Sequence, residues 1–155
     1  MALTHLIDTS VATRLNRPTV EQRLLLAVAR KRIARTRITD LERGFSARSG
    51  TEWDILVGGL SPFPLVEVRD NDLCVALDVQ RRLAAKGQRG RKLPDLIIAA
   101  VAHRLKLTVL HYDTDFDLIA EETGQTCEWV VPRGSIDSLF HQQERSVNAA
   151  LPAAR

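Results

Sequence analysis

Cysteine is scarce in this sequence. Cys74 and Cys127 are its only two cysteines, and they form no Cys-x-x-Cys pair. Disulfide-stabilised secreted domains and sulfur-based zinc sites need more cysteines at closer spacing, so both classes are excluded. The four histidines have no His-x-x-x-His spacing either, which leaves a histidine-based zinc site without support. We therefore expect reduced thiols and a cytoplasmic protein.

Long apolar runs are also missing. None reaches the roughly 20 residues that a membrane-spanning helix needs, and Asp8 interrupts the first apolar segment too early for a signal peptide. With 155 residues, 45% hydrophobic and 26% charged, the composition is typical of a soluble globular protein. We expect one domain over residues 1–135 and a weakly patterned tail over 136–155, whose last residues we expect to be disordered.

Positive charge is unevenly distributed, although the net charge is only +3. Six cations and no acid lie between Arg81 and Lys92, and a second basic group spans residues 30–37. A single cluster of this kind is usually a solvated helix end or loop. Two such clusters in a chain that also carries an acidic site indicate a phosphate backbone as the partner.

Strand and helix patterns alternate along the chain. Short apolar runs predict strands near residues 3–8, 33–38, 65–68, 107–112 and 127–131. Between them, apolar periodicity and capping residues predict helices near 10–16, from Pro18 onward, from Thr39 through Phe45, near 50–60, near 73–87, from Pro94 onward, and near 114–122. Leu25 is expected on the apolar face of the helix from Pro18, and Leu73 and Leu77 on the apolar face of the helix over 73–87. This order predicts an α/β fold in which helices cover both faces of a central, mostly parallel sheet.

Four acids fall where such a sheet collects its ligands, beyond the carboxyl ends of the strands. They are Asp8, Glu42, Asp95 and Asp113, with Asp115 close behind. Singly, each has an ordinary structural explanation as a helix cap or as a partner of a helix dipole. Together they would repel one another unless a cation neutralised them. A hard divalent ion accepts oxygen ligands alone and can activate water for attack on a phosphodiester.

Four motifs carry a resemblance to a known family. They are Leu-Ile-Asp-Thr-Ser at 6–10, Ile-Thr-Asp-Leu-Glu at 38–42, Pro-Asp-Leu-Ile-Ile-Ala-Ala at 94–100, and Leu-His-Tyr-Asp-Thr-Asp-Phe at 110–116. Each alone is weak, but their order and spacing over about residues 3–131 resemble the PIN-domain nucleases. The small size and the basic stretch before Asp95 are similar to the VapC toxins of bacterial toxin–antitoxin pairs.

The resemblance implies a PIN-like three-layer α/β/α fold and a Mg²⁺- or Mn²⁺-dependent endoribonuclease. It implies structured RNA (tRNA or rRNA) as substrate, a homodimer, and inhibition by a cognate VapB-type antitoxin that alone binds operator DNA. Carried onto this chain, Asp8, Glu42, Asp95 and Asp113 would be catalytic, and the metal ligands would be Asp8, Asp95, Asp113 and Asp115. Arg89, Arg91 and Lys92 are the candidate RNA-binding residues. His111 departs from the Thr or Ser of many relatives, so its role is open between hydrogen bonding to the site and a phosphate contact.

Two alternatives remain at this stage. Haloacid-dehalogenase-like phosphohydrolases also place an aspartate after the first strand, but they need a second aspartate two residues later, where this chain has Ser10. A catalytically silent PIN-like module that only binds partners would be marked by loss of one or more of the four acids. All four are present, which favours the nuclease.

Overall fold

A parallel sheet forms the centre of the computed structural model, which describes residues 2–136. In this part of the chain the sheet contains β1 (His5–Ile7), β2 (Ile33–Ala34), β3 (Thr108–His111) and β4 (Cys127–Trp129). The strand order is β2-β1-β3-β4, and every pair is parallel. β1 therefore lies between β2 and β3, and the connection from β2 to β3 crosses over it. The predicted parallel sheet is confirmed.

Successive strand residues point to opposite faces of the sheet, and each face has its own core. Leu6, Ala34 and Val109 pack with apolar side chains of α5 (Asp70–Ala85), α6 (Leu93–Leu105) and α7 (Asp115–Thr123). Their neighbours Ile7, Ile33 and Leu110 face the second core, together with Val20 and Leu24 of α2 (Pro18–Ala29). The strands are consequently apolar on both faces, as buried parallel strands are.

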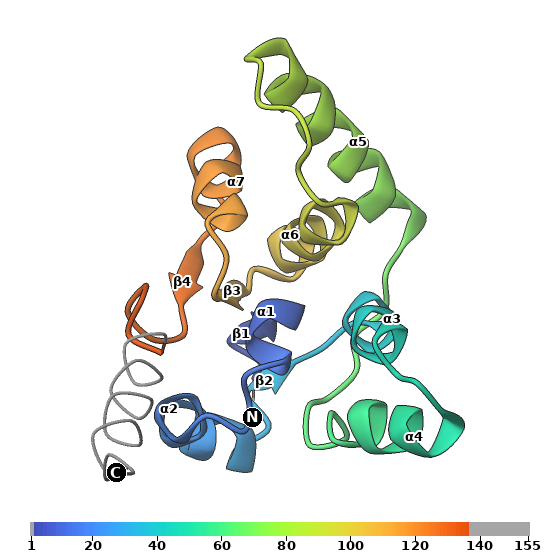
Figure 1. The fold of residues 1–155 in the computed structure, drawn as a ribbon. Coiled ribbons are helices and arrows are strands. Elements are labelled where there is room, and N and C mark those ends of the chain that lie inside the picture. The colour runs from blue at the N-terminus through green and yellow to red at the C-terminus, as the bar shows by residue number, and fades with distance from the viewer. Residues whose placement is uncertain (1, 137–155) are drawn as a thin grey trace, which may run out of the picture.

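The helices form a layer on each side of the sheet (Figure 1). α5, α6 and α7 cover one face, and α2 covers the other. The short α1 (Thr9–Ala12) follows β1 directly, while α3 (Arg37–Phe45) and α4 (Gly50–Gly58) pack against each other beside the sheet. The α/β/α prediction is confirmed. Within residues 2–136, no helix is both long and apolar enough to cross a membrane.

The strand predicted over residues 65–68 is wrong. This segment makes a single bridge, between Leu65 and Arg35, through the hydrogen bonds Arg35 N–H to Pro64 O and Val66 N–H to Arg35 O, each 2.9 Å. Pairing stops there because the partner strand β2 ends at Ala34 and the chain turns at Thr36 to begin α3. An apolar run with no strand beside it stays extended without joining the sheet.

Two helices begin earlier than predicted, α1 at Thr9 and α3 at Arg37. Asp8, one of the two capping residues that the pattern allowed for α1, is its N-cap, because its Oδ2 accepts the Ser10 backbone N–H at 2.8 Å. Thr36, rather than Thr39, caps α3, because its Oγ1 accepts the Thr39 backbone N–H at 3.3 Å. Both corrections follow from the same ambiguity: when two capping residues stand close together, the pattern alone does not say which one leaves the helical conformation.

The predicted inward faces of two helices are also partly wrong. Leu25 of α2 is 62% exposed, and Leu77 of α5 is 64% exposed. The buried apolar residues are Val20 and Leu24 in α2 and Ala76, Val79 and Leu83 in α5. Both helices carry apolar residues on more of their circumference than one sheet face can cover, so packing selects one stripe and leaves the rest exposed.

An ion pair fixes the start of α5 against the end of α6. Asp72 is only 1% exposed, and it accepts hydrogen bonds from Arg104 Nε at 2.8 Å and Nη2 at 3.0 Å. The Arg69 backbone N–H donates to the same carboxylate at 2.8 Å. Burial by itself would raise the pKa of Asp72, but these hydrogen bonds and the charge of Arg104 outweigh it and lower the pKa. The carboxylate is thus charged and fully partnered.

Asp72→Ala should destabilise the protein by about 3 kcal/mol, because it removes the carboxylate that pairs with the guanidinium of Arg104. Urea unfolding at neutral pH measures this. Asp78→Ala is the matched control on the same helix, since Asp78 is exposed and pairs only with surface arginines, and we expect a change within about 0.5 kcal/mol there. Equal effects for the two variants would contradict the anchoring role of Asp72.

Candidate metal centre

The strand order brings two of the predicted acids to the same edge of the sheet. Asp8 directly follows β1, and Asp113 lies two residues beyond β3. β1 and β3 are neighbours, with Ile7 paired to Leu110, and the Asp8 N–H donates to Leu110 O at 2.9 Å. This is the point where the strand order reverses, the place at which open α/β sheets bind their ligands.

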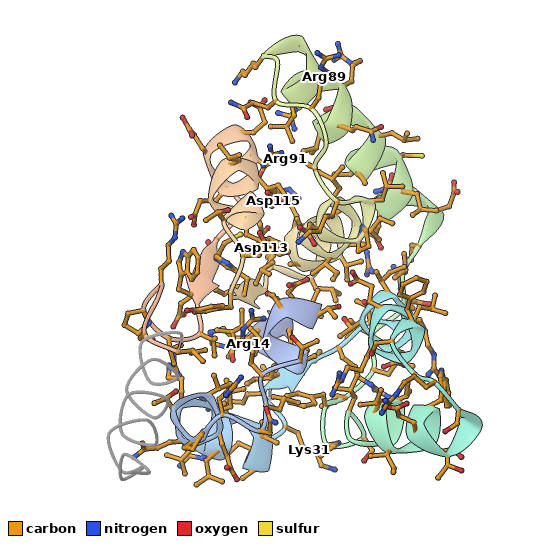
Figure 2. The ribbon with its side chains drawn as sticks, viewed as in Figure 1. Arg14, Lys31, Arg89, Arg91, Asp113 and Asp115 are labelled. Atoms are coloured by element: carbon orange, nitrogen blue, oxygen red, sulfur yellow. The ribbon has the colours of Figure 1, made fainter. Side chains whose placement is uncertain are left out.

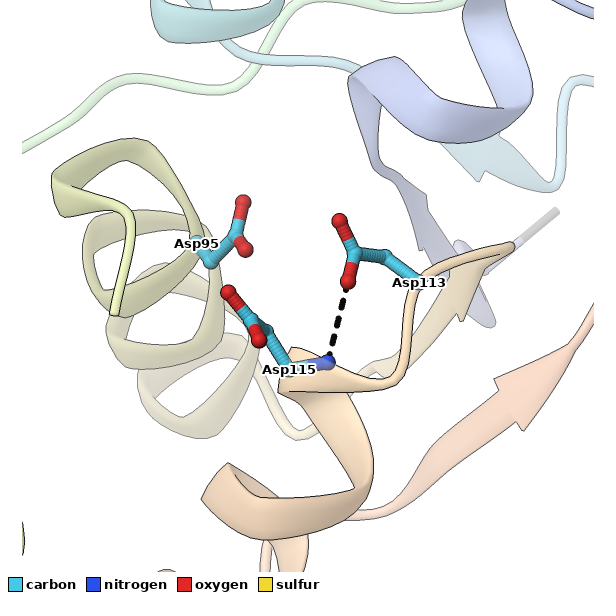
Figure 3. A group of neighbouring side chains, drawn as sticks. All are labelled: Asp95, Asp113 and Asp115. Atoms are coloured by element: carbon cyan, nitrogen blue, oxygen red, sulfur yellow. Dashed lines mark hydrogen bonds between the residues drawn. The ribbon is translucent and has the colours of Figure 1, made fainter. Parts of the chain in front are cut away.

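Asp95 reaches this edge from the first turn of α6. Its carboxylate oxygen and those of Asp113 and Asp115 lie within 4.8 Å of one another. Figure 3 shows the three side chains pointing toward one another: Asp95 comes from α6, Asp113 from the turn after β3, and Asp115 from the start of α7. The Asp115 backbone N–H donates to Asp113 Oδ1 at 3.0 Å and so orders this turn. Residues far apart in the sequence thereby form one acidic group.

Asp8 and Glu42 adjoin this group from the other side. The negative charge of Asp8 raises the pKa of Asp95 and of Glu42, and the negative charge of Asp113 raises the pKa of Asp8. Glu42 is on α3, and its Oε2 accepts a 2.5 Å hydrogen bond from Thr9 Oγ1. The residue next to Asp8 therefore holds Glu42. The Thr9 position in the first motif was the signal for this contact, as a hydroxyl able to bond an acid.

Three of these acids hold protons more tightly than ordinary carboxylates. Burial is the largest cause for Asp8, Glu42 and Asp95, and each of the three also feels a neighbouring acid. The pKa of Asp95 is raised to about 8 by its burial and by the charge of Asp8. The pKa of Asp113 is lowered instead: burial would raise it, but the Asp115 N–H and Lys92 outweigh that effect.

Two buried oxygens in the centre have no hydrogen-bond partner among the described residues. They are Asp8 Oδ1 and Asp95 Oδ2, and both residues are only 2% exposed. A buried carboxylate oxygen without a donor is costly unless a cation meets it. The atoms here that could bind a metal are all carboxylate oxygens. These are the ligands typical of Mg²⁺ and Mn²⁺, and not the nitrogen and sulfur ligands typical of zinc or copper. The residues present therefore fit a hard divalent ion.

His111 supports the acidic turn from beneath. Its ring is 0% exposed and lies between Phe116 and Trp129, with ring centroids 5.1 and 5.0 Å away. Its Nδ1 accepts the Asp113 backbone N–H at 3.3 Å, and burial is the main cause that lowers the pKa of the ring. Because the side chain is sealed from solvent, it cannot touch a phosphate. Of the two roles left open for His111, hydrogen bonding to the site is the one found.

Two of the three predicted RNA-binding cations contact the acids themselves. The Lys92 ammonium forms an ion pair with Asp113 Oδ2, and Arg91 Nη1 lies 2.6 Å from Asp115 Oδ1. Arg89 is exposed and lies at the tip of the loop, farther from the acids than Arg91 (Figure 2). The sequence showed that these cations precede Asp95, but not that they turn back onto the carboxylates.

The second basic group, residues 30–37, is divided by β2, and its first residues lie away from the acids. It begins before β2, at the amino end of the sheet, and Figure 2 shows Lys31 far from Asp113. Arg35 and Arg37 both bind Asp40, with N···O distances of 2.8 and 2.9 Å. The cation that sequence reasoning missed is Arg14, whose guanidinium lies 4.8 Å from the centroid of the Tyr112 ring, next to Asp113.

Comparison with other sequences agrees with the resemblance to PIN-domain nucleases. A model of the PIN domain matches residues 5–122. Ribonuclease VapC51 of Mycobacterium tuberculosis is 54% identical over 137 residues, which are 88% of this chain and 100% of that protein. Ribonuclease VapC21 of the same species is 42% identical over 137 residues, or 87% of this chain and 99% of that protein.

Solved structures agree on the fold. The DNA-bound VapBC of Salmonella typhimurium superposes with a TM-score of 0.69 at 22% identity, covering 83% of this chain and 99% of that one. VapBC-5 of Mycobacterium tuberculosis gives a TM-score of 0.57 at 25% identity, covering 82% of this chain and 95% of that one. Both similarities span nearly all of the described residues.

Asp95→Asn should stabilise the metal-free protein, and increasingly so as the pH rises from about 5 to 8. The pKa of Asp95 in the folded state is about 8, above its unfolded value, so the folded protein retains a proton that the unfolded chain has lost. Stability therefore falls as the pH rises through this window. Asparagine has no proton to lose, so the difference should grow by about 1.4 kcal/mol for each pH unit across most of this window.

Urea unfolding in EDTA at several pH values measures this difference. The matched control is Asp54→Asn, which removes the same charge from an exposed position on α4, outside the acidic group. A constant difference for Asp95→Asn would show that this carboxylate is not forced into a protonated state by its surroundings.

Proposed function

This chain belongs to the PIN-domain family, and within it to the VapC group, and from that premise we propose that it is a divalent-metal-dependent endoribonuclease acting as the toxin of a toxin–antitoxin pair. The observation that carries the proposal is the acidic group at the ends of β1 and β3, in which oxygens of Asp95, Asp113 and Asp115 lie within 4.8 Å. The buried, unpartnered oxygens of Asp8 and Asp95 support it further.

We assign the metal ligands as Asp8, Asp95, Asp113 and Asp115, and the catalytic residues as Asp8, Glu42, Asp95 and Asp113. When bound, Mg²⁺ or Mn²⁺ would supply positive charge to the phosphate and lower the pKa of water. Glu42 stands at the rim of the group, half-buried and oriented by Thr9. Its raised pKa suits a base that accepts a proton from the attacking water. The water adds to phosphorus, and the bond from phosphorus to the leaving ribose oxygen breaks.

RNA as the substrate rests on the relatives, which are named ribonucleases, and on the charge beside the centre. Arg89, Arg91 and Lys92 lie on the loop that leads into α6, at the same edge of the sheet as the acids. We propose that they bind phosphates on either side of a scissile bond. We propose structured RNA, tRNA or an rRNA loop, as the target, and the cytoplasm as the place of action.

A protein partner is the second part of the proposal. VapBC-5 is a toxin–antitoxin complex, and we propose that a VapB-type antitoxin likewise binds this chain, with operator DNA contacted only through the antitoxin. Supporting this, α3 exposes apolar side chains next to Glu42: Leu41 is 70% exposed and Phe45 is 91% exposed. Trp53 of α4 lies against Gly44 of α3 and is 47% exposed, which extends the apolar surface onto α4. A segment bound there would lie beside the acids and shield them from RNA.

The homodimer stays a prediction. Its support is an apolar groove of about 260 Å³ between α5 and α6, lined by residues that include Leu73, Leu77 and Leu93. Sedimentation of the isolated chain tests it. The domain boundary at residue 135 also stays a prediction, since residues 137–155 lie outside the described part of the chain.

The two alternatives are less well supported. A haloacid-dehalogenase-like mechanism needs an acid/base two residues after Asp8, and Ser10 instead uses its hydroxyl to accept the Tyr112 N–H at 2.8 Å. A silent PIN-like module has no need for an electrostatically costly group of buried acids. A covalent aspartyl-phosphate trapped on Asp8 would favour the first alternative.

Asp8→Asn and Asp95→Asn should each lower Mg²⁺-dependent RNA cleavage at least about 100-fold, because each removes a charged ligand from the centre. Initial rates on a total tRNA and rRNA substrate, with and without EDTA, measure this. Circular dichroism confirms that the variants fold, and Asp54→Asn on exposed α4 is the charge-matched control that should cleave at the normal rate. Undiminished cleavage in EDTA, or by either variant, would refute the proposal.

Phe45→Glu should weaken binding of the antitoxin at least about tenfold, because a charge would then occupy the centre of the apolar surface on α3. The test uses the cognate antitoxin, to be sought as a small open reading frame beside the gene for this chain, and measures its affinity by calorimetry. Leu26→Glu is the control, since Leu26 on α2 is 68% exposed but lies on the other side of the sheet. If both variants bind equally well, the surface on α3 is not the binding site.

A further inference from the structure

Two cations occupy the side of the acidic group that faces solvent. Lys92 binds Asp113 through Oδ2, and Arg91 binds Asp115 through Oδ1 at 2.6 Å. These are carboxylates that the proposed function assigns to the metal. The inner oxygens, Asp8 Oδ1 and Asp95 Oδ2, receive no such partner. Lys92 and Arg91 therefore neutralise only part of the negative charge of the acidic group.

We propose that Lys92, assisted by Arg91, holds the place of the metal ion at the outer acids and is released from them when the ion binds, so that both cations become available to the RNA phosphate. The inference rests on the proposed function, and it adds that metal and RNA bind cooperatively through Lys92. It makes Lys92 a residue with two alternative partners, a carboxylate before the metal arrives and a phosphate afterwards.

The position of Lys92 supports direct competition with the ion. Its charge acts on Asp113, Asp95 and Asp115, and it also acts on Glu42. One ammonium group thus interacts with four of the five acids from a single place, as a bound cation would. An ammonium group and a metal ion cannot both take the same lone pair of Asp113 Oδ2. An ion that takes the lone pair now used by the ammonium group displaces the lysine, and repulsion between the two cations favours that exchange.

The local backbone allows this displacement without a change of fold. Lys92 is the N-cap residue of α6, three residues before Asp95, so its Cα is held beside the centre. Its side chain is nevertheless 58% exposed and has four rotatable carbons with which to turn toward solvent. Arg91 precedes it in a loop that contains Gly90, at φ +79°. The main chain stays in place while the charged ends exchange partners.

Cooperativity follows from the shared residue. While Lys92 binds Asp113, the metal must displace it, and this lowers the metal's affinity. A phosphate that binds Lys92 removes the competitor, so RNA raises the affinity for the metal. By linkage, the metal raises the affinity for RNA by the same factor. A centre built in this way binds the ion weakly until the substrate is present.

The experiment measures Mn²⁺ binding by calorimetry with the full chain and no RNA. Lys92→Met should bind Mn²⁺ about tenfold more tightly than the unaltered protein, because the competing charge is gone. Its cleavage of RNA at saturating Mn²⁺ should nevertheless fall about tenfold, because the phosphate contact is lost. Arg91→Met should shift both quantities in the same directions by smaller factors.

The matched control is Lys106→Met, which removes the same charge at the opposite, exposed end of α6. At 1.5 Å per residue this lies about 16 Å from Asp95, so its effect on Mn²⁺ affinity should be less than about twofold. An equal gain for both lysine variants would reduce the effect to net charge and overturn the proposal. Weaker Mn²⁺ binding by Lys92→Met would overturn it too, since Lys92 would then be orienting Asp113 for the metal.

Lys92→Gln provides a second, polar variant with the same expected signs, should Lys92→Met fail to fold. The readouts also separate this inference from the proposed function. If the unaltered protein binds Mn²⁺ but cleaves no RNA, the proposed function fails, while tighter binding by Lys92→Met still supports the exchange. If RNA is cleaved and Lys92→Met leaves Mn²⁺ affinity unchanged, the exchange alone is wrong.

Discussion

Mutual repulsion between carboxylates that are buried together is the constraint on which the rest of the site depends. Within residues 2–136, the other buried aspartates are paired: Asp72 is held by Arg104, and Asp40 by Arg35 and Arg37. Asp8 and Asp95 are buried to the same degree and each keeps one oxygen without a partner. An unpartnered oxygen therefore distinguishes the two acids of the candidate site from the paired acids elsewhere, which burial and charge alone do not.

The fold opposes this repulsion with hydrogen bonds directed at the backbone around the acids. His111 holds the amide of Asp113, Ser10 Oγ accepts the N–H of Tyr112, and Asp8 Oδ2 caps α1. These contacts tie the end of β3 to the turn after β1. The carboxylates are therefore held close together by the main chain, so that a cation meets a site that is already formed.

Much of the fold and of the candidate site could be predicted from the sequence, because both depend on local patterns. The parallel sheet followed from apolar strands alternating with helices, and the positions of Asp8, Asp95 and Asp113 followed from strand ends and the Pro94 signal. Where the pattern allowed two choices, packing decided: it exposed Leu25 and Leu77, capped α3 with Thr36, and left residues 65–68 without a strand beside them. The ion pairs of Arg91 and Lys92 were beyond sequence reasoning, because they depend on how a loop folds back across the sheet edge.

The brevity of β2 has a consequence for how Glu42 meets the other acids. β2 contains two residues, after which Thr36 starts α3 and Glu42 follows six residues later on that helix. Each helical residue turns the side-chain direction by about 100°, so the meeting of Glu42 with Thr9 is set by a count of residues rather than by their identity. The number of residues between Thr36 and Glu42 thus fixes the direction of the Glu42 side chain. Many substitutions in this segment should leave that direction unchanged, whereas the insertion or deletion of one residue should turn the carboxylate away from Thr9.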